Sequence, residues 1–210
     1  MHYDLVGSKN LLLIFTRNPV LGKCKTRLAA TVGDESALEI YKFLLQHTVA
    51  ITKSLTAAKQ VYYSEEIKED DIWDSKFYVK KLQSGQDLGV RMANAFQEGF
   101  ASGFEKIIVI GSDMFDLDQK DIEIAFSTLA ENDFVIGPAQ DGGYYLLGMS
   151  TFNAELFQNK EWGKPTVLEA TLKNLKDEKM TLLDERNDVD LYEDIKNNEA
   201  FHPFIKHIKS

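Results

Sequence analysis

Short apolar runs alternate along the chain with longer segments in which apolar residues recur at helical spacing. Residues 11–15 are all apolar, and residues 106–110 end in four consecutive apolar side chains. Each run predicts a strand that is buried on both faces. The segments 34–48 and 88–99 instead gather their apolar side chains on one face, which predicts amphipathic helices.

The rest of the chain continues this alternation of strands and helices. Further strands are predicted at 60–64, 77–82, 134–137, 144–149 and 180–183, and further helices at 122–130, 166–175 and 191–197. Strands that alternate with helices predict an α/β protein with a mostly parallel sheet covered on both faces. The chain shows no internal repeat and no linker-like segment, so one domain spanning residues 1–210 is expected.

Composition narrows the class of protein. The chain has 44% hydrophobic and 27% charged residues, as in ordinary soluble proteins, and a net charge of -9, which argues against a nucleic-acid partner. A single cysteine, Cys24, allows no intrachain disulfide, which favours a reducing compartment. The run 11–15 is too short to span a membrane. We therefore expect a cytoplasmic protein without a membrane span.

The loop that follows the first predicted strand is the first candidate site. Ligands of open parallel sheets bind beyond the carboxyl ends of the strands. Here Arg17, Gly22, Lys23, Lys25 and Arg27 lie in a stretch that contains no acidic residue. Such cations could hold a pyrophosphate, although the spacing matches neither a Walker A loop nor Gly-x-Gly-x-x-Gly. A solvated basic loop is the alternative.

Aspartates after later strands form the second group of candidates. Asp113 directly follows the strand 106–110, where a carboxylate suits Mg²⁺ or Mn²⁺, although it could also close a turn. Asp188 and Asp190 precede the last predicted helix and are candidate metal ligands too. Asp190 with Glu193 also spells a capping box, which would explain it structurally. Asp118 is expected to cap a helix.

A third candidate is Asp141, which precedes two glycines between the strands 134–137 and 144–149. Glycines allow a close approach of the backbone to a ligand. They equally suit a tight hairpin turn, and the pattern alone leaves both interpretations open.

Six motifs, taken in order, resemble a bacterial family of GT-A-fold transferases that are described as glycosyltransferases or radical-SAM/selenodomain-associated transferases. The resemblance covers most of the chain. The motifs are Pro19 with residues 22–28, residues 86–92, residues 111–113, residues 137–146, Trp162-Gly163, and residues 188–194.

The resemblance implies a Rossmann-like nucleotide-diphospho-sugar transferase fold. It implies that Lys23, Lys25 and Arg27 contact a diphosphate, that Asp113 belongs to the metal-binding region, and that Arg91 is a site residue. The chain departs from the family pattern at Met114-Phe115, Val90 and Gln140.

The expected function is divalent-metal-dependent glycosyl transfer from a nucleotide-sugar donor to a small-molecule acceptor whose identity the sequence does not give. Asp141 would position a hydroxyl or act as base, and Trp162 would stack on an acceptor or belong to the core. One alternative is a guanylyltransferase-like nucleotidyltransferase that releases pyrophosphate. Another is a non-catalytic nucleotide-binding module, in keeping with the departures from the family pattern.

Overall fold

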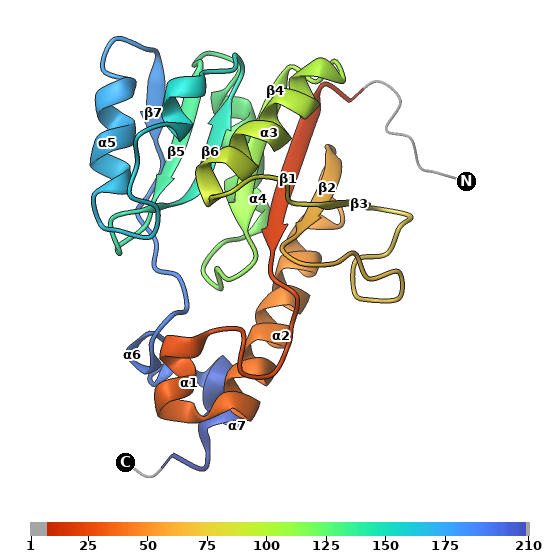
Figure 1. The fold of residues 1–210 in the computed structure, drawn as a ribbon, viewed down its shortest axis with the longest axis vertical. Helices are drawn as coiled ribbons and strands as arrows, with labels where there is room; N and C mark the ends of the chain where they lie inside the picture. The colour runs from red at the N-terminus through yellow and green to blue at the C-terminus, as the bar shows by residue number, and fades with distance from the viewer. Residues whose placement is uncertain (1–7, 209–210) are drawn as a thin grey trace.

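A seven-stranded sheet forms the centre of the molecule in the computed structural model, which describes residues 8–208 (Figure 1). The strand order is β3-β2-β1-β4-β6-β5-β7. The strands are β1 (Asn10–Thr16), β2 (Ala58–Tyr63), β3 (Val79–Leu82), β4 (Lys106–Gly111), β5 (Phe134–Pro138), β6 (Tyr144–Met149) and β7 (Met180–Leu182).

Every strand pairing is parallel except those of β6, which runs antiparallel to both β4 and β5. A tight turn joins β5 to β6, and a turn this short can only connect antiparallel neighbours. The residues 139–143 therefore form the hairpin turn that the sequence left as one of two interpretations. The expected α/β class with a mixed, mostly parallel sheet is confirmed.

Helices cover both faces of the sheet (Figure 1). Helices α2 (Asp34–Thr52) and α4 (Gln119–Thr128) pack on one face. Helices α3 (Leu88–Ala101) and α5 (Val167–Asn174) cover the other with the 3₁₀ turn η1 (Ala154–Phe157). The remaining helical elements are α1 (Thr26–Val32), α6 (Tyr192–Ile195), η2 (Glu199–Phe201) and α7 (His202–Ile205).

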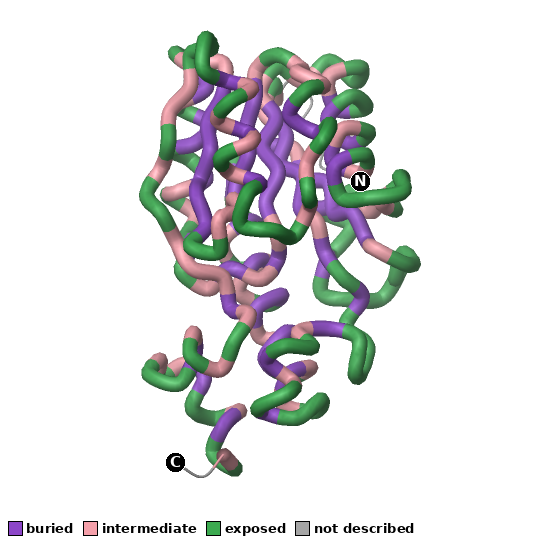
Figure 2. Tube along the Cα trace, turned by 60° about the vertical axis from the view of Figure 1, so that its left-hand side comes forward, coloured by how far each residue is buried: buried purple, intermediate pink, exposed green. Residues whose placement is uncertain are grey.

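Successive side chains of each central strand enter opposite cores, as a pleated strand requires. In β1, Leu12 and Ile14 face α2 and α4, whereas Leu11 and Leu13 face α3. All four side chains are fully buried. Figure 2 shows the buried strands as the inner part of the upper body, with exposed segments around them. This two-sided burial explains why the sequence of β1 is apolar without alternation.

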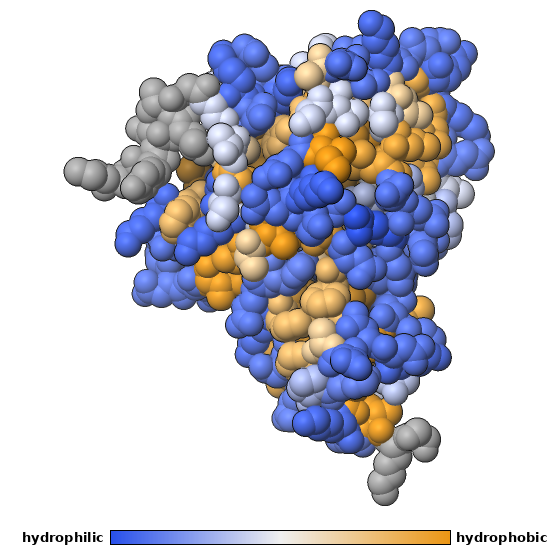
Figure 3. All heavy atoms as spheres, turned by 180° about the vertical axis from the view of Figure 1, so that it is seen from behind, coloured by the Kyte–Doolittle hydropathy of each residue, from blue (hydrophilic) through white to orange (hydrophobic). Residues whose placement is uncertain are grey.

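A third hydrophobic cluster lies below the sheet, where α1, α6 and α7 pack around the first half of α2. Leu28, Ile40 and Phe201 are fully buried in it. Figure 3 shows, from behind, that the molecule narrows from the sheet toward this part. The chain crosses from the sheet to this cluster in the loop before α1 and in residues 183–191, and both crossings carry candidate site residues.

Several local predictions are corrected. Helix α2 begins after Gly33, which leaves it without a side-chain cap. The helix predicted at 191–197 is confined to α6, and α1 and α7 were not predicted at all. Asp118 does cap α4, as expected. Among residues 8–208, no helix combines the length and apolar character needed to cross a membrane.

Candidate functional site

Lys25 and Asp113 meet at the carboxyl ends of β1 and β4. These strands are parallel neighbours, so their exits lie at the same edge of the sheet. Lys25 is the residue before α1 and has a left-handed backbone with φ 49°. Its Nζ donates a hydrogen bond to Oδ2 of Asp113 at 2.9 Å, and only 7% of the Lys25 side chain is exposed. The structure therefore brings together a predicted phosphate ligand and a predicted metal ligand.

The pair holds both groups in their charged forms. Burial alone would lower the pKa of Lys25, but attraction to Asp113 raises that pKa above its ordinary value. Burial alone would likewise raise the pKa of Asp113, but Lys25 holds it below its ordinary value. The Lys25 ammonium and the Asp113 carboxylate thus form an ion pair at the carboxyl edge of the sheet.

Asp188 is the second carboxylate here. The backbone N–H of its neighbour Val189 donates to the carbonyl oxygen of Asp113 at 3.3 Å, which ties the two loops together. Burial, followed by repulsion from Asp113, raises the pKa of Asp188 to about 6. Asp188 is therefore a carboxylate that lacks sufficient positive charge around it.

A cleft of about 230 Å³ opens beside these groups. Asp113, Asp141 and Asp188 all line it, so the structure gathers three of the predicted acidic residues. Oδ1 of Asp141 accepts a hydrogen bond from the backbone N–H of Gly143 at 2.8 Å, and the side chain is exposed. This bond fixes one carboxylate oxygen of Asp141, and the other has no hydrogen-bond partner among residues 8–208.

Most of the remaining wall of the cleft is apolar. Its side chains come from β1, β4, β6, α3 and the loop before α5, and include Phe15, Leu88, Met92 and Trp162. Trp162 lies against Gly89 so closely that an added Cβ there would fall 2.4 Å from the indole nitrogen. The cleft thus combines the three carboxylates and the cation Lys164 with a largely apolar lining, as small-molecule sites commonly do.

Arg27 and Asp190 form a second ion pair at the rim. Nη1 of Arg27 lies 2.8 Å from Oδ2 of Asp190. The capping box predicted for Asp190 and Glu193 is wrong. It is Asp194 whose Oδ2 accepts the backbone N–H groups of Asp190 and Leu191, at 2.9 and 2.6 Å. The Asp190 carboxylate therefore takes no part in capping α6 and instead pairs with Arg27 of α1.

The other residues predicted in this loop lie farther from the cleft lining. Lys23 is exposed and lies 3.8 Å from Glu65, beside the exit of β2. Gly22 has φ 73°, a conformation that favours glycine and turns the loop. The positive charge of Arg17 contributes to lowering the pKa of Asp113. None of these three residues lines the cleft.

Arg91 braces a loop. Its Nε donates to the carbonyl oxygen of Gly85 at 3.1 Å, and its Nη1 donates to Oε1 of Gln83 at 3.3 Å. These bonds hold the segment between β3 and α3, and Arg91 does not line the cleft. Its role as a site residue stays a prediction.

Two residues of structural importance at this edge were missed. The Tyr41 hydroxyl accepts a hydrogen bond from the Arg17 backbone N–H at 2.9 Å and lies 3.2 Å from Oγ of Ser112, so it joins the exits of β1 and β4. Arg186 joins the segment of Asp188 to the loop after β4. In the sequence, Tyr41 falls on the apolar face of α2, where only a role in the core is expected. For Arg186, the sequence offers only its place two residues before Asp188.

The acidic residues form no complete metal cage. Within residues 8–208, no three or more His, Cys, Asp or Glu side chains are grouped so that they could hold a metal ion by themselves. Mg²⁺ is commonly bound by one or two carboxylates together with water and substrate phosphates. Asp113 and Asp188 fit this second kind of site, in which the substrate supplies the remaining ligands.

A comparison with protein families matches residues 46–164 to the family described as "Uncharacterized protein conserved in bacteria (DUF2064)". The chain belongs to this family. The matched segment runs from α2 to the loop before α5, so it includes Asp113, Asp141 and Trp162. The cation-rich segment 17–27 and Asp188 lie outside the matched segment.

Solved structures resemble this DUF2064 protein over nearly its whole length. One, from Desulfovibrio desulfuricans G20, is described as a "putative nucleotide-diphospho-sugar transferase"; it is 29% identical, with a TM-score of 0.83 and 95% of each chain covered. The match confirms the resemblance to nucleotide-diphospho-sugar transferases that the motifs indicated. No curated protein matches the chain.

More distant structures share the fold. The inositol-1-phosphate CTP transferase from T. maritima is 11% identical, with a TM-score of 0.51 and 97% of each chain covered. A cytidylyltransferase from Leptospira borgpetersenii serovar Hardjo-bovis is 17% identical, with a TM-score of 0.51, and the match covers 87% of this chain and 77% of that one. At these identities the likeness concerns the fold alone.

Proposed function

We propose that this DUF2064 protein is a divalent-metal-dependent glycosyltransferase that uses a nucleotide-diphospho-sugar donor and a small-molecule acceptor. The observation that carries the proposal is the contact of Lys25 with Asp113, which lines a single cleft together with Asp188. The likeness to the Desulfovibrio protein over 95% of both chains supports the same class of reaction.

The charged groups at the cleft suit the leaving group. In glycosyl transfer, the bond between the sugar carbon and the diphosphate oxygen breaks, and its electron pair leaves with the diphosphate. A bound Mg²⁺ or Mn²⁺ would supply positive charge that offsets the growing negative charge. Asp113 and Asp188 would hold this ion, and Lys25 would donate a hydrogen bond to a diphosphate oxygen.

Lys23 and Arg27 would also contact the diphosphate after they leave their present carboxylate partners. Lys23 and Arg27 now face Glu65 and Asp190 in exposed ion pairs, which cost little to break. A diphosphate carries more charge than one carboxylate and would compete for both. Gly22 would supply the turn of this loop, and Arg17 would add positive charge to it. Asp190 would add a carboxylate near the ion.

Asp141 suits a role toward the acceptor. As its Oδ1 is bonded to the Gly143 N–H, its Oδ2 is free to face an incoming hydroxyl. The acceptor oxygen would form the new bond to the sugar carbon, and Asp141 would orient that hydroxyl and take its proton. The apolar wall with Trp162 and Leu88 would receive the apolar face of a sugar or acceptor.

Nucleotidyl transfer is the second candidate, favoured by the fold shared with the cytidylyltransferase and the CTP transferase. In that reaction a phosphorylated small molecule would attack the α-phosphate of a nucleoside triphosphate, and pyrophosphate would leave. Lys25 and the loop cations would then face the departing pyrophosphate.

One assay separates these reactions. The purified protein is incubated with Mn²⁺ and panels of nucleotide-sugars or of nucleoside triphosphates with sugar phosphates, and released nucleoside diphosphate and pyrophosphate are measured. Thermal shifts are recorded in parallel. Diphosphate release supports the glycosyltransferase, and pyrophosphate release supports the nucleotidyltransferase. Stabilisation by nucleotides without turnover would indicate a non-catalytic module, and the absence of both would refute all three.

A further inference from the structure

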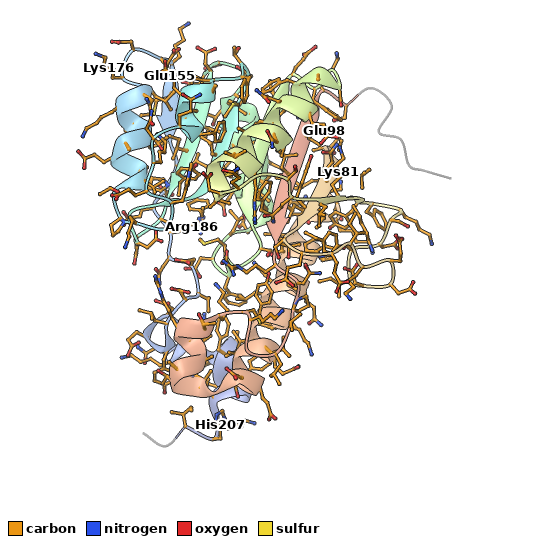
Figure 4. The ribbon with its side chains drawn as sticks, viewed as in Figure 1. Lys81, Glu98, Glu155, Lys176, Arg186 and His207 are labelled. Atoms are coloured by element: carbon orange, nitrogen blue, oxygen red, sulfur yellow. The ribbon has the colours of Figure 1, made fainter. Side chains whose placement is uncertain are left out.

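Arg186 lies at the lower end of the sheet, where the chain leaves β7 for the helices below (Figure 4). Its backbone extends the sheet beyond β5, because its N–H donates to the Pro138 carbonyl oxygen at 3.1 Å and its own carbonyl oxygen accepts the Gln140 N–H at 3.0 Å. Asp141 follows Gln140 directly, and Asp188 lies two residues beyond Arg186. The backbone of Arg186 thus joins the two segments that carry the cleft carboxylates Asp141 and Asp188.

The side chain of Arg186 contacts the loop that carries the third cleft carboxylate, Asp113. Its Nη2 lies 2.6 Å from Oδ1 of Asp121, and its Nη1 donates to the carbonyl oxygen of Asp116. Asp116 belongs to the loop that carries Asp113, and Asp121 is bonded into the first turn of α4 at the end of that loop. One guanidinium therefore spans the gap between the Asp113 loop and the Asp188 segment.

The contacts of Arg186 hold two segments in a fixed arrangement and are expected to add little to the stability of the fold. The ion pair is largely buried, with 23% of the Arg186 side chain and 19% of the Asp121 side chain exposed. Within the described residues, the buried Nε of Arg186 has no hydrogen-bond partner. Buried ion pairs often add little net stability, and an unmatched donor adds a further cost. Arg186 lines no part of the cleft, so it can affect bound ligands only through the residues it holds.

We propose that Arg186 is a positioning residue that fixes Asp113 and Asp188 at the separation needed to share one divalent cation. This inference rests on the proposed function. The forked guanidinium bonds a carboxylate and a carbonyl at once, and a lysine ammonium lacks this planar geometry. Groups that orient metal ligands typically change metal affinity by 10- to 100-fold when they are removed.

The test uses the whole protein with Arg186→Met, Arg186→Lys and Lys120→Met as the matched control. Lys120 is an exposed cation on α4, so its loss removes a nearby positive charge without touching the link. Binding of Mn²⁺ alone is measured by titration calorimetry well below each unfolding midpoint. We expect Arg186→Met to raise the Kd for Mn²⁺ roughly 10-fold or more. Arg186→Lys should show an intermediate loss, and Lys120→Met less than about a 2-fold change.

Hydrogen exchange followed by mass spectrometry provides a readout that needs no ligand. Arg186→Met should speed exchange in both segments 112–117 and 186–189, and the control should not. Unchanged exchange in these segments would overturn the inference. A lower unfolding midpoint with an unchanged Kd for Mn²⁺ would also overturn it, because Arg186 would then be merely structural. If Mn²⁺ binds only together with pyrophosphate, the same variants are compared with pyrophosphate present. If the wild-type protein binds Mn²⁺ under neither condition, the metal-dependent function fails, and with it the proposed purpose of the link.

Discussion

The ammonium of Lys25 lies 2.9 Å from the carboxylate of Asp113, although 88 positions separate the two residues in the sequence. The pairing follows from the sheet, because β1 and β4 are parallel neighbours that end side by side. In the absence of ligand, the lysine partly neutralises the carboxylate that would face a divalent cation. This relationship implies that Lys25 competes with a bare cation but assists a cation that arrives with a diphosphate.

Lys25→Met should therefore have opposite effects on two ligands. Without the ammonium, Asp113 and Asp188 are left uncompensated, so Mn²⁺ alone should bind several-fold more tightly. Pyrophosphate in the presence of Mn²⁺ should bind roughly 10-fold more weakly, because a charge-assisted hydrogen bond is lost. Titration calorimetry measures both constants. Weaker binding of Mn²⁺ alone would show that Lys25 supports the metal site directly instead of competing with it.

The same substitution should reduce stability. Removing one partner of a buried ion pair leaves the other charge unpaired, which costs about 3–5 kcal/mol when both groups are fully buried. Since 39% of the Asp113 side chain is exposed, we expect a loss of about 1–3 kcal/mol in the free energy of unfolding. Urea denaturation measures this loss. Lys25→Met with unchanged stability would mean that solvent, and not Lys25, screens Asp113.

Asp188 should make stability depend on pH. Its pKa of about 6 in the folded protein lies above the ordinary value of 3.8, so unfolding releases protons between these values and stability falls as pH rises from about 4 to about 6. The charged groups that act on it are Asp113, Lys25, Asp141 and Asp190. Asp188→Asn should stabilise the metal-free protein at pH 7.5 by on the order of 1–2 kcal/mol after solvent screening.

The pH comparison contains its own control. At pH 4 or below, wild-type Asp188 is protonated in the folded state, so the gain from Asp188→Asn should largely disappear. Thermal unfolding with a chelator present gives the comparison. An equal gain at both pH values would mean that the substitution acts through packing and not through charge.

Gly142 should be essential to the turn that presents Asp141. It has φ 85°, and an added Cβ would fall 2.3 Å from the backbone carbonyl oxygen of Pro165. Gly142→Ala should therefore cost more than about 2 kcal/mol of stability. Gly103 has φ 88° but open space around it, so Gly103→Ala should cost only about 1 kcal/mol. Equal losses in urea denaturation would show that the contact with Pro165 relaxes freely.

The strands that are buried on both faces could be predicted from the sequence. The apolar runs at 11–15 and 106–110 indicated β1 and β4 because a strand covered on both faces needs no polar positions. The direction of β6 could not be predicted, since side-chain periodicity is the same in parallel and antiparallel strands. Helix α1 was missed because its residues continue the cationic loop, and the left-handed turn at Lys25 that starts it has no sequence signature.

The candidate site was predictable to a similar extent. The meeting of Lys25 with Asp113 follows from the rule that parallel strands end together. The partner of Arg27 and the role of Asp194 depend on how α6 packs below the sheet, which no local pattern specifies. Arg186 follows a weak, short strand and belongs to no motif, so only the tertiary structure shows that it joins two loops.

A titration of pyrophosphate into the wild-type protein, Lys25→Met, Asp113→Asn and the double variant, each with and without Mn²⁺, tests whether Lys25 and Asp113 hold one diphosphate–cation unit. We expect binding that requires Mn²⁺ in the wild type and weakens roughly 10-fold or more in each single variant. We also expect a double variant little weaker than the worse single one, because both residues hold the same unit. Pyrophosphate binding that is independent of Mn²⁺ and survives both substitutions would contradict these expectations.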